Sequence, residues 1–576
     1  MLSREQREKL LDRQAEALER LAIVSDPAYK PKEKFLAKFV GFLIAGSAVV
    51  LGGYEFVRFV VESREQRVLI ANWVEAAREL YEVEGNAEAA SELLDKASEL
   101  DPQNSAVVKL GAYIEGMQAV ESLINLDRPL KKEDVSQYAK AAGQAVMLER
   151  VEPDSSDWAV LRGQLALVVN EPDRASLYLE KAIALDPSNS FAVLRMALVH
   201  QRLALKASDD ATRDIENKAC FDLLEKALKM EPNSKWVHHW LGTIAFEQKH
   251  DPVLARFHLE KAIKIDPRFA VSYHTLGSVA AQLEEWELAE ECYRRALEIR
   301  PDLALSLKGM AYVYGSKNLY EIGLRYARMS TVADPGSLEA WRMHGVMAVE
   351  VAAECMKIGD EEGSNEKIVE AINAFSNALD LDPRSSDCFI ERSALYRQSK
   401  QITEAGNDAR NAVLFAKTDP YAWESLALAQ ALGGFHSEAI ESFGKVIELD
   451  QKYDSAYLGR AKSKVSLGKF NDALTDYNLA FENASDNLKA EILLARGAFH
   501  ASRGDHKSAL ADYEVARTID DRFFDAWIAE ADSLKSLGRI SDSYVAARRA
   551  LMLRPNDARA QALNESQSVT PQPASN

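Results

Sequence analysis

The sequence is poor in the residues that build disulfide-stapled or metal-bound folds. Cysteine occurs only four times in 576 residues, and the four are 72, 63 and 33 residues apart. This spacing contains no CxxC pair and predicts neither a disulfide framework nor a zinc ribbon. Glycine (27) and proline (17) are also sparse, whereas 47% of the residues are hydrophobic. The composition is that of a folded chain and excludes a collagen-like or disordered one.

Basic residues are outnumbered, with 70 Lys and Arg against 89 Asp and Glu and a net charge of −19. Because no local basic stripe offsets this charge, we expect no nucleic-acid partner. The sequence contains no GxxxxGK[ST], GxGxxG, HExxH or GxSxG motif. His238, His239, His250 and His258 lack the i, i+4 pairing of a helical metal site, which favours solvated or packed histidines. We therefore expect no enzyme activity, no cofactor and no metal site.

Charge is absent from residues 39–54, FVGFLIAGSAVVLGGY. Sixteen helical residues rise about 24 Å, short of a hydrocarbon core of roughly 30 Å. The stretch extends to Val61 if Glu55 and Arg58 pair or snorkel. The pattern predicts a transmembrane helix over residues 39–61, after an amphipathic N-terminal segment over 1–38. The alternative is a buried helix of a soluble domain.

Lysines before this stretch slightly outweigh the arginines after it, which favours a cytoplasmic N-terminus with the body across the membrane. In a bacterium this would be the inner membrane. One stripe of small residues along the span indicates self-association through the membrane, although small residues are common in such spans. The stripe consists of Gly41, Ala45, Ala48 and Gly52.

After residue 67 the sequence repeats, and the clearest unit is Ala270 to Pro301, numbered here from Ala270 as position 1. Small residues stand at positions 8, 20 and 27, where two paired helices must approach closely. Large apolar residues stand at 4, 7, 11 and 24, and proline at 32 ends the second helix. The unit resembles the tetratricopeptide repeat, a helix–turn–helix of 34 residues.

Extending this register predicts about thirteen repeats over residues 67–555, because position 32 recurs most often at intervals of 34. The resemblance implies an all-α fold, a right-handed α-solenoid preceded by one transmembrane helix. Three longer intervals keep helical patterning, so we expect prolonged hairpins there, serving as docking points or as mere padding. Residues 556–576 are expected to form a capping helix and a disordered tail.

Tetratricopeptide arrays bind proteins along the surface lined by each first helix, at positions 2, 5, 9 and 12. Lys308 at position 5 is followed by Tyr312 at position 9 and by Met343 at position 6 of the next unit, so the carboxylate clamp of the family is absent. Lys308 and Tyr312 are nevertheless candidate protein-binding residues. An aromatic patch is the second candidate, unless these rings pack against the preceding hairpin. It consists of Trp236, His239, Trp240 and Phe246.

These features predict a non-enzymatic, membrane-anchored scaffold that binds one or more proteins and organises an assembly of the envelope, export or translocation type. The membrane partner would be the lipid bilayer around residues 39–61, and the span itself would be the site of any homo-oligomer. The alternative is a regulatory or substrate-recognition arm of an enzyme complex whose catalytic subunit is a separate chain.

Overall fold

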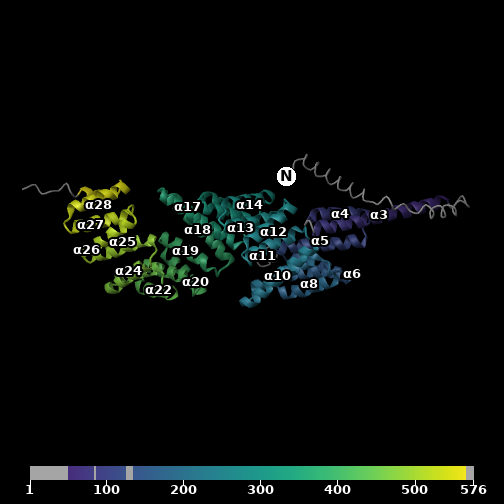
Figure 1. Ribbon diagram of the computed structural model, residues 1–576, viewed down its shortest axis with the longest axis horizontal. Helices are drawn as coiled ribbons and strands as arrows, with labels where there is room; N and C mark the ends of the chain where they lie inside the picture. The colour runs from purple at the N-terminus through teal and green to yellow at the C-terminus, as the bar shows by residue number, and fades with distance from the viewer. Residues whose placement is uncertain (1–49, 83–85, 125–133, 566–576) are drawn as a thin grey trace, which may run out of the picture. The chain divides into compact units, whose positions relative to one another are not determined.

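The computed structural model describes residues 50–82, 86–124 and 134–565. Within these ranges the chain is entirely helical, with 27 helices and no strand, which confirms the all-α fold. The first 26 helices form thirteen consecutive pairs, α3–α4 to α27–α28, and α29 follows them (Figure 1). The chain divides into two compact units at residues 240 and 241, inside α11.

The first unit contains four helix pairs and the start of α11 (Lys235–Glu247). Within each pair the two helices pack against one another, and consecutive pairs are also in contact. The helices are α3 (Val50–Glu82), α4 (Ala87–Leu100), α5 (Ser105–Ile124), α6 (Val135–Val151), α7 (Asp157–Val168), α8 (Pro172–Leu185), α9 (Ser190–Lys206) and α10 (Asp210–Met230).

The second unit contains the rest of α11, then α12, eight helix pairs and the short α29. Its helices are α12 (Pro252–Ile265), α13 (Ala270–Gln282), α14 (Trp286–Ile299), α15 (Ala304–Ser316), α16 (Tyr320–Ala333), α17 (Leu338–Lys357), α18 (Glu361–Leu381), α19 (Ser386–Gln398), α20 (Ile402–Phe415), α21 (Pro420–Leu432), α22 (His436–Leu449), α23 (Asp454–Ser466), α24 (Phe470–Asn483), α25 (Asp486–Ser502), α26 (His506–Ile519), α27 (Phe524–Ser536), α28 (Ile540–Leu553) and α29 (Ala558–Glu565).

Small residues let the two helices of a pair approach, as the α13–α14 pair illustrates. Ala289 and Ala296 are fully buried on α14. A Cβ atom on Gly277 of α13 would lie 2.8 Å from the Tyr293 ring, and one on Gly309 of α15 would lie 2.5 Å from the same ring. The Tyr293 ring therefore fills a space that exists only because both positions lack a side chain.

Among the turns between paired helices that the structure describes in full, ten contain a residue in the left-handed region, with φ between 51° and 81°. Glycine occupies this place in five turns, because it adopts positive φ without steric cost. Non-glycine residues in this conformation occupy the other five: Asn170, His250, Glu284, Asn318 and Lys400.

First helices pack on the first helices of neighbouring pairs, as α3 does on α5 in the first unit and α13 on α15 in the second. No comparably extensive contact joins the second helices of neighbouring pairs in the described ranges. The first helices therefore lie closer together than the second helices, and within each unit the wall of helices curves toward the first helices.

Longer helices occur where the repeat interval is longer. The first and second helices of the α13–α14 pair have 13 and 14 residues, whereas α9 and α10 have 17 and 21. The α17 and α18 helices have 20 and 21 residues, and α5 has 20. The surplus residues thus prolong the helices.

The expected membrane helix falls mainly outside the described residues, which include only its last part, 50–61, at the start of α3. Gly41, Ala45 and Ala48 lie outside them, and the surroundings of Gly52 are not described. Among the helices that are described, none combines the length and the apolar character needed to cross a bilayer. The anchor and its association stripe remain predictions.

Candidate protein-binding site

The predicted aromatic patch centres on α11, where Trp236 and Trp240 are half-buried. His239 is buried, and its ring meets the edge of the Trp240 ring with centroids 5.3 Å apart. Phe246 packs against the apolar cluster that α12, α13 and α14 form in the second unit. The structure thus joins His239 to Trp240 and gives Phe246 a packing role, and the use of all four as a binding surface stays a prediction.

The second predicted binding location, Lys308 and Tyr312, lies on α15. This helix packs against α14 and α16 and also contacts the first helices α13 and α17. Leu305 and Tyr312 are 49% and 47% exposed on the remaining face, and Lys308 between them is half-buried. The spacing i, i+3, i+7 places the three side chains in one row. We call this row the α15 face. The Lys308 ammonium has no carboxylate partner among the residues that the structure describes.

An aromatic contact supports the end of the α15 face. The Tyr312 ring lies edge-on to the Trp286 ring of α14, with centroids 6.0 Å apart and an interplanar angle of 62°. Such edge-to-face pairs contribute about 0.5–1.5 kcal/mol beyond area burial and restrict the orientation of the ring. The phenol is therefore held in place while it is still half accessible to a partner.

A neutral histidine of α13 lies within electrostatic range of Lys308. The Nδ1 atom of His274 is 3.2 Å from the Ser306 hydroxyl, and its ring lies 5.5 Å from the Tyr293 ring. Burial, and then the charge of Lys308, lower the pKa of His274 to about 4. The histidine is uncharged at neutral pH, so Lys308 supplies the positive charge here.

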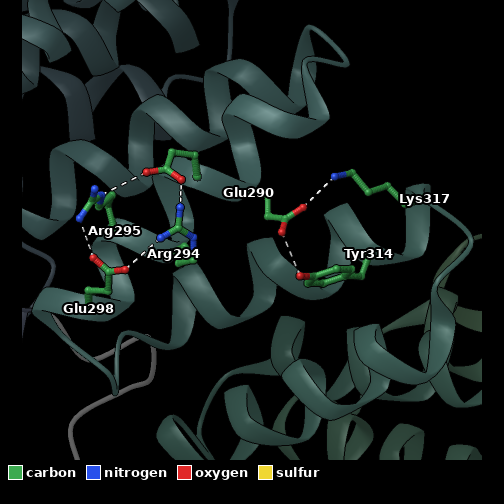
Figure 2. Close-up of polar contacts among 7 residues, drawn as sticks. Glu290, Arg294, Arg295, Glu298, Tyr314 and Lys317 are labelled. Carbon is green, nitrogen blue, oxygen red and sulfur yellow. Dashed lines mark hydrogen bonds and ion pairs between the residues drawn. The ribbon is translucent and has the colours of Figure 1, made fainter.

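Figure 2 shows how α15 is fixed to α14. The Glu290 carboxylate accepts hydrogen bonds from the Tyr314 hydroxyl at 3.1 Å and from the Lys317 ammonium at 2.7 Å. The bond from Lys317 is the main cause of the lowered pKa of Glu290. Burial, with a further contribution from Glu290, raises the pKa of Tyr314 to about 12. The Tyr314 ring also stacks on Tyr326 of α16 at 5.6 Å, so this end of α15 is tied to both neighbouring second helices.

The other contacts in Figure 2 form a ladder on the surface of α14. Arg294 and Arg295 each bridge Glu291 and Glu298, which lie two helical turns apart. All four side chains are between 44% and 54% exposed. Exposed pairs of this kind contribute about 0.3–0.5 kcal/mol each, so the ladder supports the helix and gives no sign of a binding site.

Sequence reasoning missed a recurrent buried ion pair. Arginine at position 7 meets aspartate at position 23 of the same repeat, 16 residues later, through two parallel hydrogen bonds. The three pairs are Arg392–Asp408, Arg460–Asp476 and Arg496–Asp512. The recurrence of Arg and Asp at one spacing was the available signal, and it concerns packing inside the repeat.

Sequence reasoning also missed a recurrent hydrogen bond from tryptophan side chains to the backbone of the preceding repeat. The indole N–H of Trp423, at position 4, donates to the backbone carbonyl of Lys417 at 2.9 Å. Trp341 and Trp527 make the same bond to Pro335 and Asp521, which like Lys417 occupy position 32 of the preceding repeat. Position 4 therefore joins consecutive repeats, and its tryptophans have a structural role beyond packing.

Comparison with known proteins supports the repeat assignment. Sequence models of the tetratricopeptide repeat match residues 270–303 and 458–522. The chain is 30% identical to human tetratricopeptide repeat protein 6 over 159 residues, which are 27% of this chain and 30% of that protein. It is 31% identical to the small glutamine-rich tetratricopeptide repeat-containing protein 2 of Mycosarcoma maydis over 119 residues, 20% of this chain and 33% of that protein. The matches thus span about a third of these curated relatives.

Among solved structures, the Cut9–Hcn1 hetero-tetramer of the APC/C is similar over 87% of this chain and 96% of the compared chain, with 14% identity and a TM-score of 0.39. The protein YrrB is similar over 36% of this chain and 99% of its own, with 21% identity and a TM-score of 0.29. Residues 270–303, which include α13 and α14, and residues 458–522 are tetratricopeptide repeats, set in an all-α solenoid of helix pairs.

Proposed function

We propose that this chain is a non-enzymatic scaffold that binds partner proteins on the first-helix side of its repeats, with the α15 face as a principal contact. We further propose that residues 39–61 tether it to a membrane, where it organises an assembly of the envelope, export or translocation type. Tetratricopeptide repeat proteins act as protein-interaction scaffolds, which supports the first part.

The observation that carries the proposal is Lys308, whose ammonium has no carboxylate partner in the described part of the chain and which lies between the exposed side chains of Leu305 and Tyr312. The Lys308 stem is partly covered, and its ammonium has no carboxylate partner in the described part of the chain, so the charge is available to an acidic group of a partner. A partner segment with an acidic residue beside apolar or aromatic ones would supply both missing contacts. Exposed tyrosine is also a preferred anchor of protein interfaces.

Site-specific photocrosslinking tests this proposal in the full-length chain. A photoreactive phenylalanine analogue at Leu305 is expected to give a discrete adduct with a partner protein. Lys308→Glu in the same chain should reduce that adduct at least fivefold, because the charge complementarity is reversed. The analogue at Met329, which is 50% exposed on the second helix α16, serves as the matched control and should give no such adduct.

An adduct at Leu305 that is unaffected by Lys308→Glu would contradict the role of the α15 face. The variant Trp236→Ala with Trp240→Ala, compared by the same measurement, tests the aromatic patch separately. Because both rings are half-buried, circular dichroism must first show that this variant keeps its helix content.

The tether has its own test. Deletion of residues 1–66 should release the protein from the membrane fraction into the aqueous fraction and leave the helix content of the repeats unchanged. An intact chain that stays in the aqueous fraction without detergent would contradict the tether. The role of the α15 face would be unaffected by this result, because the photocrosslinking experiment tests it separately.

A further inference from the structure

One arginine on the first-helix side of the second unit differs from the other half-buried arginines that the structure describes there. Arg397, at position 12 of α19, is half-buried, and its guanidinium makes no hydrogen bond or ion pair with any described residue. Its Nε atom is buried and has no hydrogen-bond partner within the described ranges. A buried polar group without a partner is rare in a native protein and calls for a specific explanation.

The other half-buried arginines of this unit show what the fold ordinarily provides. There are seven among the described residues, and each forms an ion pair with a carboxylate at 2.5–3.0 Å. Three are the position 7 arginines described above. The remaining four pairs are Arg256–Glu285, Arg328–Glu370, Arg342–Glu339 and Arg517–Glu530.

The carboxylate whose charge acts on Arg397 is already engaged elsewhere. Glu424 of α21 interacts with Arg397 through its charge alone. Its two oxygens accept hydrogen bonds from the hydroxyl groups of Tyr453 and Ser455, at 2.7 and 2.5 Å. Burial lowers the pKa of Arg397 despite the charge of Glu424. Arg397 therefore lacks the bonded carboxylate that its seven counterparts have.

Apolar side chains lie between the α15 face and Arg397 in the order of the repeats. Met343 and Val346 of α17 and Ile390 of α19 are half-buried, at positions 6, 9 and 5. All three pack against the same apolar cluster, to which both helices contribute, and α15 contacts α17. The first-helix surface from the α15 face to Arg397 is therefore continuous and partly apolar.

Negative charge gathers on the middle section of this surface. Glu391 of α19 lies within electrostatic range of Glu350 of α17 and of Asp387, and none of the three forms an ion pair with a described residue. A partner carboxylate opposite this section would be repelled. The unpaired cations Lys308 and Arg397 stand on helices to either side, so the surface accepts negative charge at two separate places.

The separation of these two places sets the length of chain that joins them. Packed helices lie about 8–10 Å apart, and seven residues along a helix rise about 10 Å. Two helix spacings combined with that rise separate Lys308 from Arg397 by roughly 20 Å, which an extended chain covers in about six residues.

We propose, building on the proposed function above, that Arg397 is a second anion anchor for the same partner. The partner presents an extended segment with two acidic residues about six positions apart, one for Lys308 and one for Arg397. Side chains alternate along an extended segment, so an even spacing directs both carboxylates toward the same surface. Apolar residues at the two intervening positions of that side face Met343 and Ile390.

Fluorescence anisotropy with the full-length protein and a labelled peptide tests the inference. The probe has the core Glu-Ser-Leu-Ser-Leu-Ser-Glu. One control has the rearranged core Leu-Ser-Glu-Ser-Glu-Ser-Leu, with the same composition and charge, and the other replaces both glutamates of the probe by glutamine. The probe should bind about tenfold more tightly than either control, because only its carboxylates reach both cations and avoid Glu391.

Arg397→Gln and Lys308→Gln should each weaken the binding of the probe about fivefold. Arg397 has no bond to lose within the described protein, so its replacement breaks no ion pair of the fold. Arg384→Gln, at an exposed arginine in the turn before α19, is the matched control and should leave the affinity unchanged.

Three results would overturn the second anchor: equal binding of the probe and the rearranged peptide, no binding of the probe, or an equal effect of Arg397→Gln and Arg384→Gln. A loss in Lys308→Gln without a loss in Arg397→Gln would overturn it as well and leave the α15 face supported. The photocrosslinking experiment at Leu305 uses no peptide, so failure of the proposed function is recognised separately from failure of this inference.

Discussion

The guanidinium of Arg392 and the carboxylate of Asp408 face each other across the α19–α20 pair, with Nε–Oδ2 and Nη2–Oδ1 distances of 2.7 and 2.9 Å. Asp408 is only 5% exposed, and Nη1 of Arg392 donates to the Ser376 hydroxyl at 2.8 Å. Burial of this kind is tolerated because each charge has a partner and the guanidinium is hydrogen-bonded on both sides. The pair replaces an apolar contact that other repeats make at position 7.

Removing one residue of the Arg392–Asp408 pair should destabilise the fold more than removing both. Asp408→Ala leaves a largely buried guanidinium unpaired and should lower the local free energy of unfolding by about 3 kcal/mol. The double variant Arg392→Leu, Asp408→Ala should lose much less, since leucine stands at position 7 of the next repeat as Leu426. Hydrogen exchange of the amides of α19 and α20 measures both, because it reports the opening of one pair within a long array. Equal losses in the two variants would contradict this explanation.

Much of the fold could be predicted because the repeat restricts residue size at regular positions. Gly277, Ala289 and Ala296 stand where helices touch, and the interval of 34 therefore predicts the helix pairs directly. The charged residues at positions 7 and 23 recur at a constant spacing of 16, but that spacing alone does not show that they touch. Their contact depends on the distance between two packed helices, which sequence spacing along one helix does not encode.

The candidate sites were less predictable than the fold. Lys308 and Tyr312 lie on one helix, so their position in the repeat was enough to place them together. Arg397 also stands at a first-helix position, but the sequence does not show that its guanidinium has no ion pair with the described residues. The Glu424 carboxylate that acts on it is bonded to Tyr453 and Ser455 at the start of α23, an arrangement that depends on tertiary packing alone.

Two glycines in helices should respond to alanine in opposite directions. In Gly277→Ala the new methyl group would lie 2.8 Å from the Tyr293 ring, which is held between two helices, and we expect a loss of about 1–3 kcal/mol from overpacking. A Cβ atom added to Gly444 of α22 would meet no other part of the described protein within 4 Å, so Gly444→Ala should gain about 0.5–1 kcal/mol. Urea unfolding followed by circular dichroism measures both. A loss in Gly444→Ala would show that helix propensity does not control this position.

Replacing Lys400 by glycine should stabilise the turn between α19 and α20. Lys400 has φ of 58°, whereas glycine occupies the corresponding turn residue of the next repeat as Gly434, with φ of 81°. The left-handed conformation costs a non-glycine residue roughly 1–2 kcal/mol, and the greater freedom of glycine in the unfolded chain offsets part of this. We expect Lys400→Gly to raise the free energy of unfolding by about 0.5–1 kcal/mol. Lys417→Gly provides the control for loss of a lysine, and a gain of the same size there would refute the conformational explanation.

The half-buried His274 should make stability depend on pH in one window. Burial and the charge of Lys308 lower its pKa to about 4, whereas an exposed histidine titrates near 6.5. Between these values the unfolded chain binds a proton that the folded chain excludes, so acidification from pH 6.5 to 4 lowers the free energy of unfolding. The slope from one such group is at most about 1.4 kcal/mol per pH unit. His274→Asn keeps a polar side chain for Ser306 but cannot titrate. The urea-unfolding midpoint of this variant should therefore change less between pH 6.5 and 4 than that of the parent protein. Identical slopes in the two proteins would show that other groups govern the acid sensitivity.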